Sequence, residues 1–302
     1  KPLFALYFMA HTPVKTASKD SAFLDELIAF IQEKGYVWGP FPELYGGFSG
    51  FYAYGPLGKL LKQKVEDRVR RVFQKHGFWE VECPLVVPDV VWKASGHLDT
   101  FVDRTVICSM CKSMFRADKL IEEVHDVSAD GFSDEELLQF IQKQKIVCPT
   151  CKGSFVQKIE HQSLMMKTKV ADADASLRPE TATVTYLPFK RYYDFFRRKL
   201  PVRVFQIGKA FRNEISPRQH LLRCREFTQA ELQIFFDPDR IDECDDWNEV
   251  KTYKLRLFLA KSQKIDEIRC DDATKKLNIP KFYAYHLAKI QQFYLDNLEI
   301  PK

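Results

Sequence analysis

Two sets of residues in this sequence have types and spacing that could support chemistry. The first is the stretch FRNEISPRQHLLRCREFTQAE, residues 211–231, which contains four arginines and three glutamates between apolar segments. The second is a pair of Cys-x-x-Cys motifs, Cys108/Cys111 and Cys148/Cys151, separated by 36 residues. The charged stretch could hold a highly charged ligand or form a solvated hairpin, and the cysteines could bind a metal ion or act as redox thiols.

The cysteine pairs favour a structural metal site. Two such pairs can present four thiolates at the corners of a tetrahedron, the geometry of closed zinc sites. The spacer exceeds the roughly 15–20 residues of common zinc ribbons, but it contains SDEELLQFIQ, in which Ser133 and Glu136 have capping-box spacing for a helix. We therefore expect structural Zn²⁺ on the four cysteines, with no open position for catalysis. A module without metal and a redox pair remain alternatives, and His125 is predicted to face solvent.

The charged stretch has the alternation of a β-hairpin. Alternate residues of a strand share a face, so Arg212 and Glu214 would project from one strand on the same side as Arg223, Phe227 and Glu231 from the next. Exposed ion pairs contribute only about 0–1 kcal/mol each, and a ladder of them needs no central phenylalanine. A nucleoside triphosphate would use the whole set, because arginines bind phosphate oxygens and an aromatic ring stacks on a base. These residues alone leave a nucleotide site and a solvated charged hairpin both open.

The surrounding sequence predicts the elements that would carry these residues. Helical spacing predicts a helix over 21–35, capped by Ser21 and ended by Gly35, and a basic amphipathic helix over 57–77. A strand is predicted over 78–88, where Pro84 favours a sheet edge, an interface or a bulge. Further predicted elements are a strand over 159–170, a loop over 171–176, a helix over 181–199, and strands over 202–214 and 221–236. Their order predicts an α+β fold with a mainly antiparallel sheet flanked by helices.

Composition is that of an ordinary globular protein of 302 residues, enough for one large domain and a module. The net charge of +5 permits a polyanionic partner without identifying one. No apolar run approaches the roughly 20 residues that span a bilayer. The apolar start, residues 1–10, favours a tag remnant or a first strand over a secretory signal, because no small-residue cleavage pattern follows. Eight cysteines in such a chain favour reduced thiols and a cytoplasmic location.

Several segments together resemble the dimeric glycyl-tRNA synthetases of archaea and eukaryotes, which are class II aminoacyl-tRNA synthetases. The charged stretch resembles motif 2 of that class, and HGFWEVECPLV, residues 76–86, resembles motif 1. The cysteine pairs resemble an insertion of archaeal members. The segments that resemble glycyl-tRNA synthetases in particular are LRPETA (177–182), GFSGFYAYGPLG (47–58), WKASGH (92–97) and QIGKAFRNEISPR (206–218).

The resemblance implies a domain organisation and a reaction. Residues 1–103 and 157–302 would belong to the catalytic domain, and residues 104–156 would form the inserted zinc-binding module. Glycine and ATP, with Mg²⁺, would give glycyl-adenylate, and glycine would then pass to tRNA(Gly). A homodimer is expected through the motif 1 helix and the strand around Pro84.

The resemblance also assigns roles to individual residues. Arg212 would hold the α-phosphate, Glu214 would accept from the adenine amino group, Phe227 would stack on adenine, and Arg223 would lie near the γ-phosphate. No side chain needs to act as a strong base, because the glycine carboxylate is already the nucleophile.

Glu180 and Glu231 would form an anionic wall for the glycine ammonium, and Arg178 would support that wall or approach the substrate. The alternative for Glu180 is a carboxylate at a helix N-terminus, where the macrodipole favours it. His97 could serve the site or cap a loop.

The sequence departs from the family pattern at its C-terminal side. Class II enzymes have a third, glycine-rich motif with a second phosphate-binding arginine, and this chain has no glycine after Gly208. The anticodon-binding domain is not recognisable either. We therefore expect a fragment of a synthetase, a subunit of a split enzyme, or a paralogue that binds nucleotide or RNA without aminoacylation. In each case the 302-residue chain alone should be weak or inactive in aminoacylation.

Overall fold

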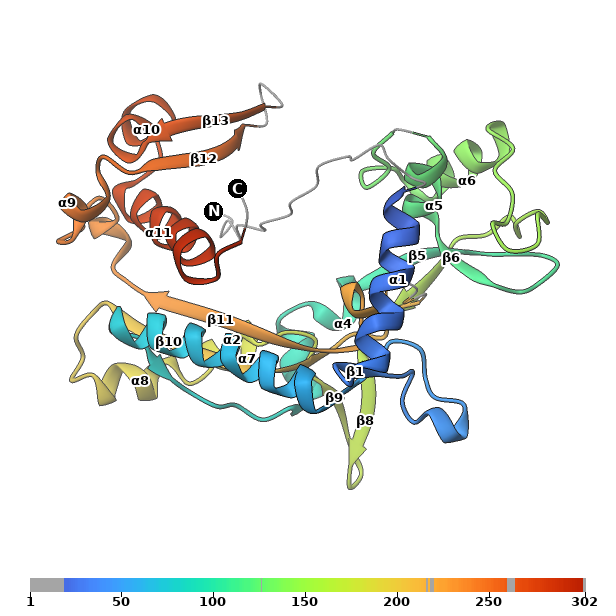
Figure 1. The fold of residues 1–302 in the computed structure, drawn as a ribbon, viewed down its shortest axis with the longest axis horizontal. Helices are drawn as coiled ribbons and strands as arrows, with labels where there is room; N and C mark the ends of the chain where they lie inside the picture. Colours follow the sequence, from blue (N-terminus) through green and yellow to red (C-terminus); the bar gives the residue numbers. More distant parts are fainter. Residues whose placement is uncertain (1–18, 126, 216, 218–219, 260–263, 301–302) are drawn as a thin grey trace.

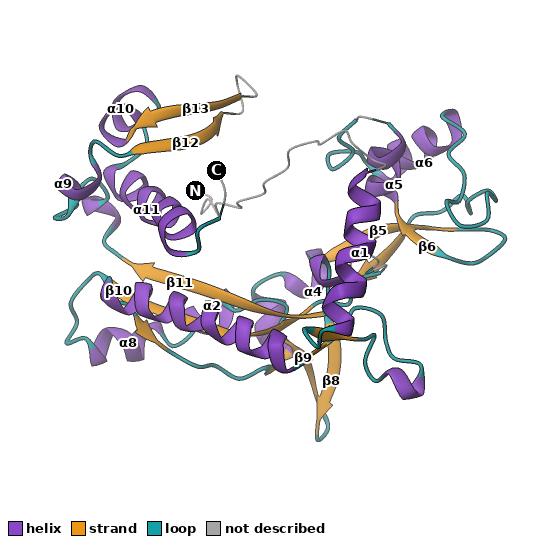
Figure 2. Ribbon diagram, in the orientation of Figure 1, coloured by secondary structure: helices purple, strands orange, loops and turns teal. Residues whose placement is uncertain are grey.

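The computed structural model describes residues 19–125, 127–215, 217, 220–259 and 264–300 (Figure 1). The first strand considered within residues 1–10 lies outside these described residues. Figure 2 shows helices and strands intermixed along the chain. The α-helices are α1 (Lys19–Glu33), α2 (Pro56–Lys75), α3 (Asp89–Ala94), α4 (His97–Thr100), α5 (Ala117–Val124), α6 (Asp134–Lys143), α7 (Ala182–Tyr186), α8 (Phe189–Phe195), α9 (Trp247–Val250), α10 (Cys270–Lys276) and α11 (Lys281–Gln292). The strands are β1 (Val37–Trp38), β2 (Ala53–Tyr54), β3 (Trp79–Glu80), β4 (Val86–Pro88), β5 (Val102–Ile107), β6 (Met114–Arg116), β7 (Glu160–Ser163), β8 (Met166–Val170), β9 (Ala173–Leu177), β10 (Val202–Phe211), β11 (Glu226–Phe235), β12 (Lys254–Leu259) and β13 (Lys264–Arg269).

The strands form small sheets whose pairings are mostly antiparallel. Within the described residues the sheets are β11–β10–β3, β4–β9–β8, β6–β5–β7, β12–β13 and β1–β2. Among these pairings, β3 runs parallel to β10 and the others are antiparallel. The predicted mixed fold with mainly antiparallel pairing is therefore confirmed, although the pairing is divided among several sheets.

Several predicted segments differ from the structure. The strand expected over 159–170 is divided into β7 and β8, which belong to different sheets. The strand expected over 78–88 is divided into β3 and β4, with Pro84 in the irregular stretch between them, so the chain leaves one sheet and enters another there. The loop expected over 171–176 belongs largely to β9. The helix expected over 181–199 is broken into α7 and α8, because Pro188 lies between them and has no backbone N–H to donate.

The N-terminal helix follows its predicted spacing except at its start. α1 begins at Lys19, so Ser21 lies within the first turn of the helix and not before it. Gly35 follows the helix with a positive φ of 72°, which confirms it as the stop.

Helix α2 is the predicted basic amphipathic helix, and its apolar stripe extends beyond the core. Val69 is buried, whereas Leu57, Leu61 and Val65 are 42–55% exposed. The helix therefore presents an apolar surface at its N-terminal half.

Residues 102–163 form a unit, the cysteine module, that packs around a core of its own. Its core residues include Val106, Phe115, Leu120, Ile121, Leu137, Ile141 and Phe155. The predicted capping box opens α6: the Ser133 hydroxyl accepts from Glu136 N–H, and the Glu136 carboxylate accepts from Ser133 N–H. The longer spacer between the cysteine pairs is thus folded around this helix.

The C-terminal segment forms another core, built from α9, α10, α11 and the β12–β13 hairpin. Figure 1 shows this unit in orange and red near one end of the β10–β11 hairpin, with the green cysteine module near the other. The two units therefore lie toward opposite ends of the hairpin.

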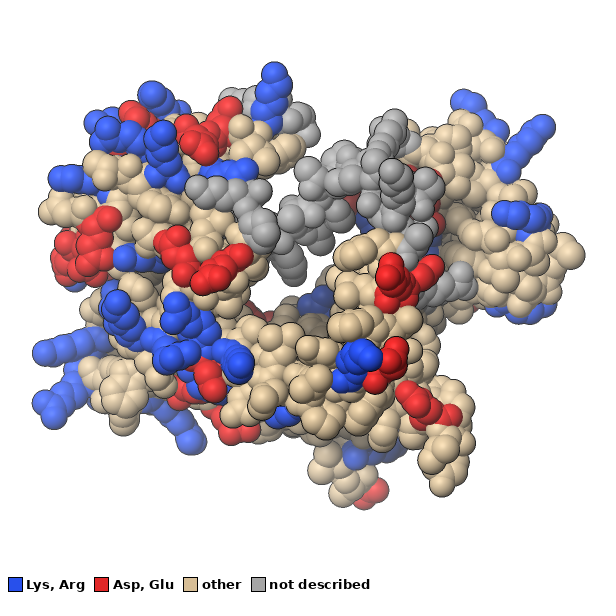
Figure 3. Space-filling view, in the orientation of Figure 1, with Lys and Arg blue, Asp and Glu red and all other residues tan. Residues whose placement is uncertain are grey.

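Lys and Arg side chains are spread over several elements on the face drawn in Figure 3, with Asp and Glu among them. In the part of the chain that the structure describes, no helix combines the length and the apolar character that crossing a membrane requires.

Candidate functional site

The β10–β11 hairpin is a ribbon with two chemically different faces. Val202 pairs with Phe235 and Phe211 with Glu226, which fixes the register along both ten-residue strands. Directly opposite residues of such a pair share a face. The front face carries Gln206, Gly208, Phe227, Gln229 and Glu231, and the back face carries Ile207, Lys209, Glu226, Thr228 and Ala230. The predicted hairpin is confirmed over Val202–Phe211 and Glu226–Phe235. Arg212, Glu214 and Arg223, which were predicted to lie on its strands, lie in the segments between them.

Arg212 lies against two aromatic rings at the loop end of the front face. Its guanidinium carbon is 5.2 Å from the Phe227 ring centroid and 5.5 Å from the Phe101 ring centroid. Arg212 Nε donates to the carbonyl oxygen of Pro179 at 3.1 Å. Ring faces attract a cation, so the structure brings together two predicted ligand residues and adds Phe101, which the sequence analysis did not identify.

Glu214 and Arg223 form an ion pair across the base of the loop between the strands. Arg223 Nε donates to Glu214 Oε2 at 2.9 Å, and the Glu214 side chain is only 11% exposed. The backbone carbonyl oxygen of Glu214 accepts from Arg225 Nε at 2.9 Å. A ligand that contacts both members of the pair must therefore offer a hydrogen-bond donor and an anionic group close together.

Two glutamates interact beside Thr181. Glu231 accepts from the Thr181 hydroxyl at 2.7 Å. Glu180 accepts from two backbone N–H groups at the start of α7, at 2.8 and 2.9 Å, so its alternative role at a helix N-terminus is confirmed. Burial raises the pKa of Glu231, the Thr181 hydrogen bond opposes that shift, and the charge of Glu180 adds to it. A cation bound between the carboxylates would relieve their repulsion.

Arg178 is buried beneath the ribbon and is 1% exposed. It donates to the carbonyl oxygens of Lys209 at 2.7 Å and Cys83 at 2.8 Å, and to the Gln206 side chain at 3.3 Å. A Cβ on Gly208 would lie 2.2 Å from Arg178 Nη2, so only glycine fits there. Two roles were predicted for Arg178: support of the anionic wall formed by Glu180 and Glu231, or contact with the substrate. This geometry favours support of the wall, because so buried a side chain cannot approach a substrate.

The four predicted metal ligands come together at one end of the β5–β6 hairpin. The Sγ atoms of Cys108, Cys111, Cys148 and Cys151 lie within 4.8 Å of one another. Two of the separations are 3.4 Å, between Cys108 and Cys151, and 3.6 Å, between Cys111 and Cys148. Sulfurs bound to one zinc at about 2.3 Å lie about 3.8 Å apart. The donor set and its spacing therefore fit a tetrahedral metal ion.

The two Cys-x-x-Cys turns have the same backbone form. Lys112 and Lys152, which follow the second cysteine of each pair, have positive φ values of 59° and 63°. Each donates its N–H to the carbonyl oxygen of the first cysteine of its pair. Hydrogen bonding with Ser113 lowers the pKa of Cys111 to about 6, which favours the metal-binding thiolate.

His125 is not a member of this cluster, and its predicted solvent-facing position is wrong. Its ring packs edge-on against Phe140, with centroids 5.5 Å apart. The Nε2 atom is buried and has no hydrogen-bond partner within the described residues.

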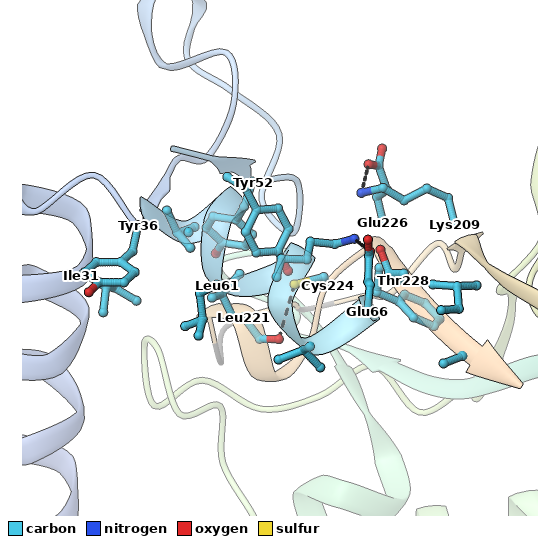
Figure 4. Close-up of a pocket in the computed structure, with 18 of the residues that line it drawn as sticks. Ile31, Tyr36, Tyr52, Leu61, Glu66, Lys209, Leu221, Cys224, Glu226 and Thr228 are labelled. Carbon is cyan, nitrogen blue, oxygen red and sulfur yellow. Dashed lines mark hydrogen bonds and ion pairs between the residues drawn. The ribbon is translucent and has the colours of Figure 1, made fainter. Parts of the chain in front are cut away.

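A pocket of about 490 Å³ lies on the back face of the ribbon. Figure 4 shows Ile31 of α1, Tyr36, Tyr52, Leu61 of α2 and Thr228 of β11 around it. The ion pairs Lys62–Glu66 and Lys209–Glu226 border the pocket. Phe227 of the front face also borders this pocket. No sequence pattern indicated the pocket, because its walls come from segments far apart in the chain.

Comparisons with known proteins show a similarity to one class of enzymes. The family described as tRNA synthetase class II core domain (G, H, P, S and T) matches residues 166–294, which include α7 and the whole β10–β11 ribbon. Among solved structures, a putative threonyl-tRNA synthetase from Aeropyrum pernix aligns with a TM-score of 0.46 and 16% identity, over 74% of this chain and 38% of that one. Residues 166–294 of this chain therefore match the core domain of class II tRNA synthetases.

Within that class, the chain is a homologue of archaeal glycine–tRNA ligases. It is 44% identical over 280 residues to the glycine–tRNA ligases of Thermococcus gammatolerans and Pyrococcus abyssi, covering 90% of this chain and 48% of each relative. It is 38% identical over 286 residues to that of Methanococcus maripaludis, covering 90% of this chain and 50% of the relative. The chain thus spans about half the length of these relatives.

Proposed function

We propose that the protein containing this chain is a glycine–tRNA ligase that activates glycine with ATP and transfers it to tRNA(Gly). The front face of the ribbon carries this proposal, because an arginine, an aromatic ring and two interacting glutamates occur there together. The 44% identity to glycine–tRNA ligases supports it. Catalysis would rest on positioning and electrostatics, since the glycine carboxylate is already a nucleophile.

For ATP, Arg212 would hold the α-phosphate and stabilise the charge that develops there during in-line attack. Adenine would stack on Phe227, and Glu214 would accept from its amino group. Arg223 would meet the γ-phosphate. Since Glu214 and Arg223 are 2.9 Å apart, both roles require a triphosphate that folds back toward the adenine. Mg²⁺, when bound, would neutralise the phosphate oxygens.

For glycine, Glu180 and Glu231 would supply the negative potential that attracts the ammonium group. Arg178 would hold the base of this wall through its backbone contacts. Because glycine has no side chain, selectivity must come from exclusion of a Cβ, whereas attraction of one methylene yields only about 1–3 kcal/mol.

Glycine-dependent ATP–pyrophosphate exchange by the intact protein tests this proposal. We expect exchange with glycine, and a rate about 100-fold lower with alanine. Equal exchange with both amino acids would contradict the assignment to glycine. Normal ATP binding without any exchange would favour the nucleotide-binding paralogue instead.

We also propose that the four clustered cysteines hold a structural Zn²⁺. Purified protein should contain about one zinc per chain. Cys148→Ser should remove the metal and lower the melting temperature, whereas Cys244→Ser, outside the cluster, should leave the metal in place. Zinc well below one equivalent in protein purified without chelator would contradict the site.

A homodimer through α2 and the segment around Pro84 completes the proposal. The exposed apolar side chains of Leu57, Leu61 and Val65 support it, because an apolar surface of this kind is typical of an interface. We assign the reaction to the cytoplasm, where free thiols such as the eight cysteines of this chain stay reduced.

A further inference from the structure

His97, at the start of α4, faces one of the two glutamates proposed for the glycine ammonium. Its Nε2 atom is 3.9 Å from Glu180 Oε1, and the two side chains are 23% and 17% exposed, so a small ligand can reach both. That separation is too long for a hydrogen bond. The Glu180 oxygens accept instead from the backbone N–H groups of Ala182 and Thr183. The two side chains therefore face each other without a direct hydrogen bond.

The other ring nitrogen of His97 is bonded within its own turn. Nδ1 lies 2.9 Å from Ser95 Oγ. The Ser95 hydroxyl has one proton, which it donates to the carbonyl oxygen of Trp92 at 3.2 Å. Ser95 Oγ must therefore accept from Nδ1–H. Because a neutral imidazole carries its proton on one nitrogen only, Nε2 faces Glu180 as an acceptor.

Aromatic side chains hold the His97 ring in this orientation. The ring packs edge-on against the buried Trp92 and against Phe101, with centroids 5.3 and 5.7 Å apart. The Phe101 ring also contacts the Arg212 guanidinium, whose carbon is 5.5 Å from the ring centroid. One aromatic ring therefore borders both the proposed ammonium site and the proposed α-phosphate site, which the reaction has to bring together.

We propose that His97 is a glycine-binding residue, whose unprotonated Nε2 accepts a hydrogen bond from the substrate ammonium alongside Glu180 and Glu231. This inference rests on the proposed function, because it assigns a further residue to the same glycine site. Two acceptors that are each about 2.9 Å from one tetrahedral nitrogen lie about 4.7 Å apart. His97 Nε2 and Glu180 Oε1 are 3.9 Å apart, so a shift of about 1 Å lets both accept from the same ammonium nitrogen.

A neutral acceptor suits this position electrostatically. The charges of Glu180 and Glu231 already repel each other, which contributes to the raised pKa of Glu231. A third carboxylate would add to that repulsion, whereas an imidazole nitrogen can accept the third N–H of the ammonium without further negative charge. The ammonium makes this contact both before and during the reaction. Its loss should therefore raise the KM for glycine and leave kcat nearly unchanged.

Two substitutions distinguish contact with glycine from a role in holding the turn through Ser95. In His97→Gln the side-chain oxygen can reach the position of Nε2, whereas the shorter His97→Asn reaches only the position of Nδ1. Both are measured by ATP–pyrophosphate exchange with the intact protein. His97→Asn should raise the KM for glycine by about tenfold or more, the value of a hydrogen bond to a charged group, and His97→Gln by less than about threefold. The KM for ATP should stay within about twofold of the wild-type value in both variants.

The matched control is His161→Asn, in the cysteine module. His161 is an exposed histidine that pairs with Asp134, and its substitution should change neither KM. Absence of glycine-dependent exchange in the wild type would overturn the proposed function and this inference with it.

Three outcomes with an active wild type would overturn the inference alone. They are an unchanged KM for glycine in His97→Asn, a rise in His97→Gln as large as that in His97→Asn or larger, and equal rises in the KM for glycine and for ATP. If a denaturant titration shows that His97→Asn does not fold, Ser95→Ala decides instead. Without the hydroxyl that accepts from Nδ1, Nε2 is no longer fixed as the acceptor, so the KM for glycine should rise by about threefold or more. An unchanged KM in Ser95→Ala would equally overturn the inference.

Discussion

The two faces of the β10–β11 ribbon share one backbone and have different surroundings. On the front face, the ribbon's glutamines and Glu231 are engaged by the turn around Thr181. On the back face, mostly apolar side chains and two ion pairs border a pocket. Adjacent residues such as Glu226 and Phe227 therefore project to opposite faces of the ribbon, although both border the pocket. A substitution should therefore affect the nucleotide site or leave it unchanged according to the face of the ribbon to which its side chain projects.

The largest effect is expected for Arg212. Arg212→Ala should lower kcat/KM for glycine-dependent ATP–pyrophosphate exchange by about 10²–10³-fold, the cost of losing one preorganised group at a developing charge. Lys209→Ala, on the back face, removes a partly exposed ion pair with Glu226 and should change the rate by less than about threefold. Similar losses of kcat/KM in the two variants would contradict the proposed functional difference between the faces.

A smaller effect is expected for Phe227. Phe227→Ala should raise the KM for ATP by about 5–150-fold, because stacking of a base on an aromatic ring is worth about 1–3 kcal/mol. Thr228→Ala, the next residue, points to the back face and should leave this KM nearly unchanged. Phe227→Tyr should retain most of the affinity, and an unchanged KM in Phe227→Ala would exclude stacking on this ring.

The smallest expected effect is the pH dependence of glycine binding that Glu231 causes. Its pKa is raised above the ordinary value of 4.5, chiefly by burial, so the carboxyl stays protonated to higher pH than an exposed glutamate. The ammonium group of glycine binds more tightly to the ionised carboxylate of Glu231 than to its protonated form. Glycine affinity, measured by titration between about pH 4.5 and 7.5, should therefore increase with pH through the raised pKa and then level off.

Two variants control this pH experiment. Glu231→Gln should weaken glycine binding and abolish its pH dependence. Glu226→Gln, at the back face, should leave the profile as in the wild type. A wild-type affinity that does not change across this interval would remove Glu231 from the glycine site.

The sequence predicted what depends on local spacing. Alternation gave the faces of the ribbon, the Cys-x-x-Cys spacing gave the thiol cluster, and Ser133 with Glu136 gave the capping box. Contacts between distant segments were not predictable: Phe101 contacts Arg212 from more than 100 residues away. The back-face pocket was missed for the same reason, because α1, α2 and the ribbon meet only in the folded chain. The sequence offered two alternative roles for Glu180, but it could not show that one carboxylate both accepts from the start of α7 and contributes to the raised pKa of Glu231.

Arg178 has a consequence for how the molecule unfolds. Its guanidinium binds the backbone of Cys83, the backbone of Lys209 and the side chain of Gln206, and Gly208 leaves the room for it. Three segments separated by about 30 to 130 residues thus depend on one buried cation, which cannot leave any of them without exposing donors that lack partners. These segments should therefore open as one cooperative unit, with native-state hydrogen exchange giving their most protected amides a common free energy of opening.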